Sequence, residues 1–173
     1  MSCDNLDQQF LETFIEREGL NDIFRRNVTK YFNAYAHRLA ELAEASSRPI
    51  IVGLNGAQGS GKSTLSQYLS QMMPMLLGVD CHVLSIDDFY LSKAKRNRLA
   101  ASVHPLLAIR GVPGTHDVPR LLDALADFIE PSVHSVKVPI FDKLKDDRTR
   151  KVHKIQKSAK PTCLLYTSPS PRD

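Results

Sequence analysis

The stretch PIIVGLNGAQGSGKST, residues 49–64, decides how this chain folds. Its first half is a short apolar run rich in β-branched residues, which is typical of a buried strand. The second half contains GAQGSGKS, residues 56–63, which matches the pattern G-x-x-x-x-G-K-[ST]. Glycines let successive backbone N–H groups turn inward around phosphate oxygens, and the helix that begins near Gly61 adds its positive end. The sequence therefore predicts a phosphate-binding loop, or P-loop.

The residue types in this loop predict which ligand atoms each one meets. Lys62 is expected to reach the β- and γ-phosphates of a nucleoside triphosphate, and the Ser63 hydroxyl to ligate Mg²⁺. The alternative is a glycine-rich structural turn. The motif by itself does not separate a kinase from a GTPase or a mechanical ATPase. The predicted cofactor-binding residues are Gly56, Ala57, Gln58, Gly59, Ser60, Gly61, Lys62, Ser63 and Thr64.

Hydrophobic periodicity outlines the elements around the loop. A strand, a glycine-rich loop, a helix and a second buried strand follow one another, and this order predicts a parallel α/β sheet with flanking helices. Two helices precede it as an N-terminal extension. The predicted helices are residues 6–17, 22–45, 65–75 and 118–129, and the predicted strands are residues 49–55, 81–86 and 133–141.

Length and composition fit a single domain with a real core, since 42% of the 173 residues are hydrophobic. The N-terminus MSCDNLDQQF carries acidic residues where a signal peptide carries basic ones, and no apolar run approaches the ~20 residues that span a bilayer. We therefore expect a cytoplasmic protein with no membrane partner.

The net charge of +4 is concentrated in KLKDDRTRKVHKIQK, residues 143–157. We expect a solvated loop there and no nucleic acid partner, because no aromatic residues are interleaved for base stacking. A nucleic-acid-linked P-loop ATPase is the alternative that this charge favours. A GTP-dependent switch would need an N-K-x-D motif, and the sequence contains none.

The second predicted strand ends in SIDDFY, residues 85–90. Strands of a parallel sheet face the ligand crevice with their carboxyl ends, so Asp87 and Asp88 are expected beside the P-loop. Asp87 could take the proton of an attacking hydroxyl or hold Mg²⁺. We favour the base, because Phe89 and Tyr90 supply an aromatic wall suited to a small substrate. Asp88 or Ser92 could instead cap the following helix.

Four segments together resemble the glycerate 3-kinase family, a branch of the P-loop kinases related to uridine, pantothenate and phosphoribulo-kinases. They are GAQGSGKST, DDFYL, HPLLAIRGVPGTHD (residues 104–117) and VPIFDKLKDDR (residues 138–148). The resemblance implies transfer of the ATP γ-phosphate to a small hydroxy acid, D-glycerate. A uridine- or pantothenate-type kinase with another substrate and a non-catalytic ATP-binding module are the alternatives.

The resemblance also implies roles for individual residues. Asp87 matches the catalytic base, assisted by Lys62. Arg110 is suited to a carboxylate substrate because its fork binds carboxylates bidentately, although it could equally pair with an internal acid such as Asp87. His116 could be a hydrogen-bonding residue at a helix start, and Asp117 could cap that helix. The substrate-side positions are Asp88, Tyr90, Arg110, His116, Asp117, Asp142 and Lys143.

The chain departs from the family pattern at its C-terminal end. Relatives continue through a strand with an acidic residue and Gly-Trp, then a basic lid, whereas this chain has no tryptophan and we expect no apolar strand after Arg148. Residues 163–173, CLLYTSPSPRD, are what a transposase-type sequencing adapter encodes. We therefore expect a helical extension (1–48), a partial kinase core (49–162) that is inactive by itself, and an adapter-derived end (163–173). A genuine Ser/Pro-rich disordered end is the alternative.

Overall fold

The chain begins with helices that the sequence predicts. The computed structural model describes residues 3–57, 59–158 and 162–166. In it α1 (Cys3–Glu18) is followed by α2 (Asp22–Asn27) and α3 (Asn33–Ala45), which a π-helical turn, Val28–Phe32, joins without a break. The Asn21 side chain starts α2 by accepting hydrogen bonds from the backbone N–H groups of Ile23 and Phe24. Both predicted N-terminal helices are confirmed.

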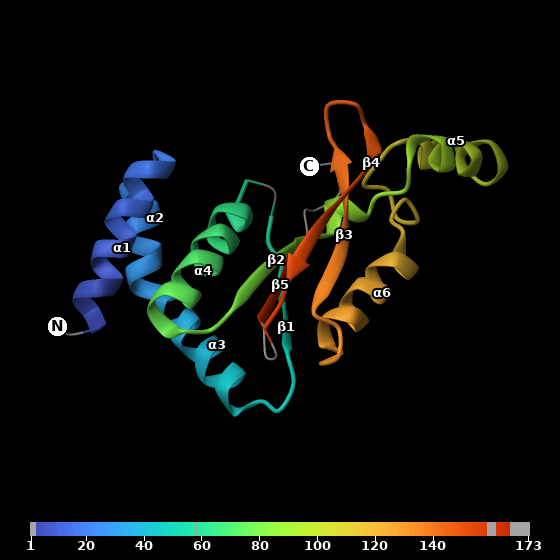
Figure 1. The fold of residues 1–173 in the computed structure, drawn as a ribbon. Helices are drawn as coiled ribbons and strands as arrows, with labels where there is room; N and C mark the ends of the chain where they lie inside the picture. The colour runs from blue at the N-terminus through green and yellow to red at the C-terminus, as the bar shows by residue number, and fades with distance from the viewer. Residues whose placement is uncertain (1–2, 58, 159–161, 167–173) are drawn as a thin grey trace.

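A parallel sheet forms the centre of the molecule (Figure 1). Its strands are β1 (Ile50–Leu54), β5 (Thr162–Tyr166) and β2 (Cys81–Ser85), in that spatial order. The P-loop connects β1 to α4 (Lys62–Leu77), which returns the chain to β2. Because the strands are parallel, the P-loop and the residues after β2 lie at the same edge of the sheet.

The middle strand of this sheet corrects one expectation. We expected no apolar strand after Arg148, and this was wrong, since β5 pairs with both β1 and β2. β1 and β2 are not hydrogen-bonded to each other, because β5 lies between them. The backbone N–H and C=O groups of β5 pair with those of β1 on one side and of β2 on the other. Residues 167–173, the remainder of the predicted adapter-derived end, lie outside the described residues.

A second sheet is formed by β3 (Ser135–Asp142) and β4 (Asp147–Gln156), which pair antiparallel. β3 was predicted as a strand, whereas the solvated loop expected over residues 143–157 is wrong for β4. β4 is mostly polar, but its residue Ile155 is buried and pairs with Val136, which is also buried. Backbone pairing with β3 therefore outweighs the local composition.

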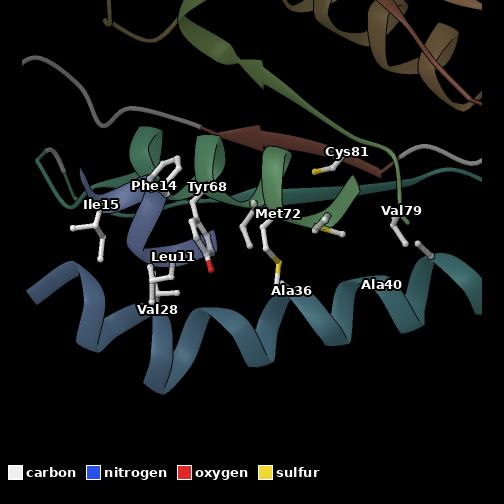
Figure 2. Packing of buried hydrophobic residues seen from close by; sticks show 13 residues of the cluster. Leu11, Phe14, Ile15, Val28, Ala36, Ala40, Tyr68, Met72, Val79 and Cys81 are labelled. Carbon is white, nitrogen blue, oxygen red and sulfur yellow. The ribbon is translucent and has the colours of Figure 1, made fainter. Parts of the chain in front are cut away.

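Hydrophobic clusters cover both faces of the parallel sheet. On one face, α1, α3 and α4 pack together around Phe14, Tyr68 and Met72, so the N-terminal helices share their core with the helix that follows the P-loop (Figure 2). On the other face, α6 (Val118–Ile129) packs on β3, with Phe128 and Val136 fully buried.

The remaining α-helix, α5, spans Lys93–Ser102, between β2 and α6 in the chain. Among the described residues, no helix is long and apolar enough to cross a membrane.

Candidate functional site

The glycine-rich turn that was predicted as the P-loop joins β1 to α4 and folds around the Lys62 side chain. Gly59 and Gly61 adopt left-handed backbone angles, with φ of 71° and 82°, which L-residues with side chains rarely adopt. Lys62 begins α4 and is largely buried, and its ammonium donates hydrogen bonds of 2.6 Å to the carbonyl oxygens of Gly56 and Ala57. A cation is thus held inside the loop at a helix N-terminus, where anions are stabilised. Gln58, a predicted member of the cradle, lies outside the described residues.

Asp87 lies at the same edge of the sheet as the P-loop. A short 3₁₀ turn, Ile86–Phe89, follows β2 and begins where the Asp87 N–H donates to the Ser85 hydroxyl. The carboxylate is nearly buried, and its Oδ2 accepts a 2.8 Å hydrogen bond from Lys143 Nζ. Its Oδ1 is buried with no partner among the described residues. The P-loop follows β1 and Asp87 follows β2. Because only β5 lies between these two strands, their axes are about 10 Å apart.

Asp88 has a different environment from its neighbour. Its Oδ1 accepts a hydrogen bond from the Phe141 N–H at 3.2 Å, so it ties β3 to the end of β2. Burial raises the pKa of Asp88, and the negative charge of Asp87 raises it further. Ser92, and not Asp88, caps α5, because the Ser92 hydroxyl accepts from the Lys95 N–H. The structure therefore separates the two carboxylates into a free acceptor and a structural tie.

An aromatic wall stands beside Asp87. The Tyr90 ring stacks on the His116 ring with 4.2 Å between centroids, and the Phe141 ring makes a T-shaped contact with Tyr90 at 5.2 Å between centroids. Burial and the charge of Asp87 raise the pKa of Tyr90 to about 12. Burial lowers the pKa of His116, although the charge of Asp87 opposes this, and His116 Nε2 is buried with no partner among the described residues. The wall thus presents a neutral imidazole next to a carboxylate.

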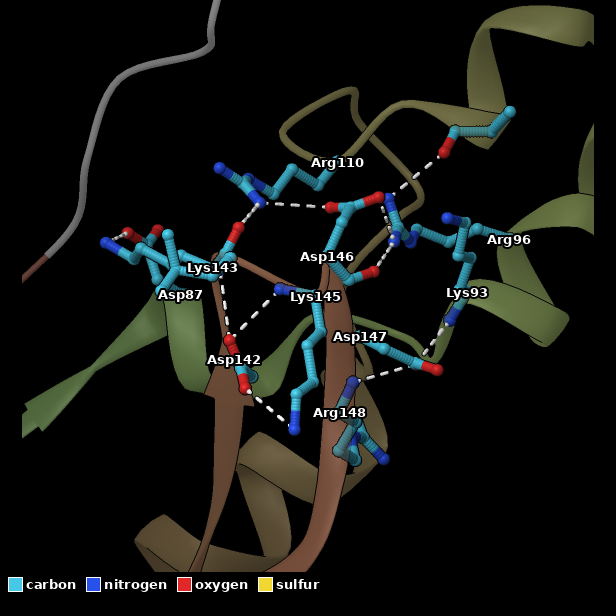
Figure 3. A network of polar contacts seen from close by, with 12 residues as sticks. Asp87, Lys93, Arg96, Arg110, Asp142, Lys143, Lys145, Asp146, Asp147 and Arg148 are labelled. Carbon is cyan, nitrogen blue, oxygen red and sulfur yellow. Dashed lines mark hydrogen bonds and ion pairs between the residues drawn. The ribbon is translucent and has the colours of Figure 1, made fainter.

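Arg110 contacts the backbone of Lys143, the residue whose side chain binds Asp87 (Figure 3). Its Nη1 donates to the backbone oxygen of Lys143 and to Asp146 Oδ1, both at 3.0 Å. The alternative that Arg110 pairs with an internal acid is therefore confirmed, although the acid is Asp146 and not Asp87, whose carboxylate binds Lys143. About a third of the Arg110 side chain is exposed.

Two of the predicted substrate-side carboxylates serve the local structure. Asp142 Oδ1 accepts hydrogen bonds from the backbone N–H groups of Leu144 and Lys145, which closes the turn between β3 and β4. Asp117 stands at the N-terminus of α6 without the predicted capping hydrogen bond, because its carboxylate is bound by Arg148 Nη1 at 2.9 Å. That guanidinium also donates to the Tyr90 carbonyl at 2.7 Å.

Sequence reasoning missed three residues that hold this region together. Arg96, on a helix that reads as solvent-exposed, is fully buried and donates to the carbonyl oxygens of Ala108 and Asp146. Asp146 and Arg148 stand in the quoted segment DKLKDDR, but nothing in that segment shows which of its charges turn inward. The pattern of α5, KAKRNRLAAS, also gives no signal for Arg96, because it stands among the other basic residues Lys93, Lys95 and Arg98.

The chain has a P-loop NTPase-like α/β fold of the kind found in P-loop kinases. The family profile for the KAP family P-loop domain matches residues 32–110. Among solved structures, the chain is similar to D-glycerate 3-kinase from Cryptococcus neoformans var. grubii, with 27% identity and a TM-score of 0.63 over 77% of this chain and 52% of that chain. A possible uridine kinase from Bacillus stearothermophilus, 20% identical with a TM-score of 0.56 over 79% of this chain and 71% of that chain, shares the fold.

Two curated yeast proteins match part of the chain. An uncharacterized kinase, mug58, of Schizosaccharomyces pombe is 38% identical over 109 residues, 62% of this chain and 39% of that protein. The probable ATP-dependent kinase TDA10 of Saccharomyces cerevisiae is 33% identical over 103 residues, 55% of this chain and 36% of that protein. The matches thus cover less than two fifths of each curated relative. The resemblance that the sequence motifs predicted is confirmed at the level of the P-loop kinase fold.

Proposed function

We propose that this chain is the nucleotide-binding part of an ATP-dependent kinase that phosphorylates a hydroxyl group of a small metabolite, D-glycerate. The observation that carries the proposal is the half-satisfied carboxylate of Asp87. One of its oxygens is held by Lys143, and the other is buried and has no partner among the described residues. A buried, unpaired acceptor at the ligand edge of a parallel sheet is suited to receive the proton of a substrate hydroxyl.

The proposed reaction is an in-line transfer. The substrate oxygen forms a bond to the γ-phosphorus while the bond from that phosphorus to the β–γ bridging oxygen breaks, and ADP leaves. Asp87 Oδ1 accepts the proton of the hydroxyl, and Lys143 keeps the carboxylate in one orientation. Lys62 and the backbone N–H groups of the P-loop stabilise the negative charge of the transferring phosphoryl group. Most of the rate then comes from positioning and charge stabilisation.

The groups around Asp87 support a substrate that carries a carboxylate. Arg110 and Lys143 are cationic, and His116 presents a buried nitrogen that has no partner among the described residues. Guanidinium groups bind carboxylates through two parallel hydrogen bonds, which fixes the orientation of the substrate as well as its affinity. A hydroxy acid would therefore place its carboxylate toward Arg110 and one hydroxyl toward Asp87.

A magnesium ion is part of the proposal. Among the described residues, no three His, Cys, Asp or Glu side chains gather as a protein-built metal site. The Ser63 hydroxyl, at the start of α4, fits the alternative arrangement in which a P-loop residue and the nucleotide phosphates hold the ion together. When bound, the ion would neutralise charge on the β- and γ-phosphates.

The basic segment at residues 143–157 gives little support to a nucleic-acid-linked ATPase. Lys143 pairs with Asp87, and Arg148 pairs with Asp117. Lys157 donates to three carbonyl oxygens at the C-terminal end of α6. These three cations have partners within the chain, which is why a small-molecule kinase without a nucleic acid partner is the function proposed. A cytoplasmic location, predicted from the N-terminal sequence, belongs to the same proposal.

Phosphotransfer assays on the protein expressed from its complete genomic reading frame test this function. We expect Mg²⁺- and ATP-dependent ADP release with D-glycerate, and formation of a phosphomonoester detected by ³¹P NMR. Preference for uridine or pantothenate would identify another kinase of this fold. ATP binding without transfer to any of these acceptors would favour a non-catalytic module, and salt-sensitive stimulation by nucleic acid would favour the ATPase.

A further inference from the structure

The turn that joins β3 to β4 ends in an unusual residue, Asp146. Its φ of 52° makes it the one non-glycine residue in the left-handed region among the described part of the chain. A residue with a Cβ resists this conformation, and aspartate tolerates it better than most because its short polar side chain can form local bonds. Such strain persists only where surrounding contacts hold it in place.

Those contacts come from two arginines on different segments (Figure 3). Asp146 Oδ2 binds Arg96 Nη2 at 2.9 Å, and Oδ1 binds Arg110 Nη1 at 3.0 Å. The backbone oxygen of Asp146 also accepts from Arg96 at 2.6 Å. A single carboxylate therefore bridges α5 and the segment that carries Arg110. Burial opposes its ionisation, but the hydrogen bonds from Arg96 and Arg110 prevail and lower the pKa of Asp146.

The two arginines differ in how firmly they are held. Arg96 is fully buried and is tied to the Ala108 carbonyl as well as to Asp146. Arg110 is about one third exposed and is held only by Asp146 and the Lys143 carbonyl among the contacts described. Both guanidinium groups lie against the Phe141 ring, at 5.7 and 5.8 Å from its centroid. Arg96 is thus the fixed support, and Arg110 is the group that the carboxylate orients.

We propose that Asp146 is a positioning residue that holds the Arg110 guanidinium beside Lys143 and Asp87, so that its remaining N–H groups face an anionic substrate. The proposal rests on the proposed function for the identity of that substrate. Asp146 accepts at one Arg110 nitrogen, Nη1, and the other guanidinium nitrogens stay available for a carboxylate. The Asp146 carboxylate neutralises only one of the two guanidinium charges of Arg96 and Arg110, so this cluster keeps a net charge of +1.

Replacing Asp146 by asparagine removes the charge and keeps the shape of the turn. Asparagine also tolerates the left-handed conformation, so Asp146→Asn is expected to fold. A matched control is the neighbouring Asp147→Asn, because Asp147 accepts from the backbone N–H groups of Lys93 and Arg148 and has no described contact with Arg110. The same chemical change is thus compared at adjacent positions.

The first measurement is steady-state kinetics on the protein from its complete reading frame. We expect Asp146→Asn to raise KM for D-glycerate about tenfold to a hundredfold, which is the range for weakening hydrogen bonds to a charged group. KM for ATP should stay close to that of Asp147→Asn, whereas the melting temperature should be lower, because the fully buried Arg96 loses its anionic partner. A parallel loss of kcat and ATP affinity would show a merely structural brace and would overturn the proposal, as would unchanged kinetics.

A second measurement does not depend on catalysis. Phenylglyoxal modifies accessible arginine side chains, and mass spectrometry of the peptide containing Arg110 reports its rate of modification. We expect Arg110 to react several-fold faster in Asp146→Asn than in wild type or Asp147→Asn. An unchanged rate would refute the positioning role. Faster modification in a protein that transfers no phosphate to D-glycerate would leave the positioning role standing and reject the proposed function.

Discussion

The replacement Asp87→Asn tests the assignment of the base most directly. Asparagine has nearly the same shape as aspartate, but its amide group does not accept a proton at neutral pH. General-base catalysis contributes about 10²- to 10⁴-fold to rate, so kcat should fall by that factor, which corresponds to roughly 3–5 kcal/mol of transition-state stabilisation. The P-loop belongs to a different segment, so the affinity for ATP should remain.

The effect of the same replacement on folding should be much smaller. The ion pair with Lys143 is lost, but 61% of that lysine side chain is exposed, so solvent screening limits its contribution to about 1 kcal/mol or less. Replacing a carboxylate of which only 8% is exposed by a neutral amide acts in the opposite direction. The stability of the two proteins should therefore agree within about 1 kcal/mol.

The assay is coupled ADP release with saturating Mg²⁺-ATP and D-glycerate, together with urea unfolding of the same preparations. Asp88→Asn is the matched control, because Asp88 accepts a backbone N–H from Phe141 that an amide oxygen can also accept. Its turnover should remain close to that of wild type. Turnover of Asp87→Asn within about tenfold of wild type, with unchanged stability, would refute the base assignment.

Three further predictions concern the loop, the aromatic wall and the C-terminal end. Lys62→Ala should abolish the rise in melting temperature that Mg²⁺-ATP produces, because the ammonium group in the P-loop is lost. Lys154→Ala, on an exposed position of β4, is the control and should retain the rise. Equal thermal shifts in the two variants would refute phosphate binding by the P-loop. Burial lowers the pKa of His116, so the unfolded chain takes up a proton near pH 6.5 before the folded chain does, and stability should fall as the pH drops from 7 to 5. Urea unfolding of His116→Gln should show less of this fall, and an identical pH dependence would reject the buried neutral imidazole. Genomic sequencing across the codon of Thr162 should reveal a reading frame that departs from this sequence after Thr162. A genomic frame that encodes residues 163–173 and stops after Asp173 would show that the tail is genuine.

Several features of this protein follow from local sequence. The glycine-rich loop, the strand before it and the helix after it were all predicted, because each depends on backbone conformation and on residues close in the chain. The position of Asp87 at the ligand edge also follows from local order, since a carboxylate directly after a strand of a parallel sheet must face that edge. These are the features that a pattern of consecutive residues determines.

The tertiary structure decided how the remaining charges are used. Asp87 and Asp88 are neighbours in sequence, yet only contacts with Lys143 and Phe141, more than fifty residues away, make one a free acceptor and the other a structural tie. Likewise, β4 is a strand because β3 supplies its hydrogen-bonding partner. Arg96 is buried because Asp146 and two backbone carbonyls surround it. Pairings between distant segments leave no periodic signal in the chain, so sequence patterns located the site and only the fold assigned its polar contacts.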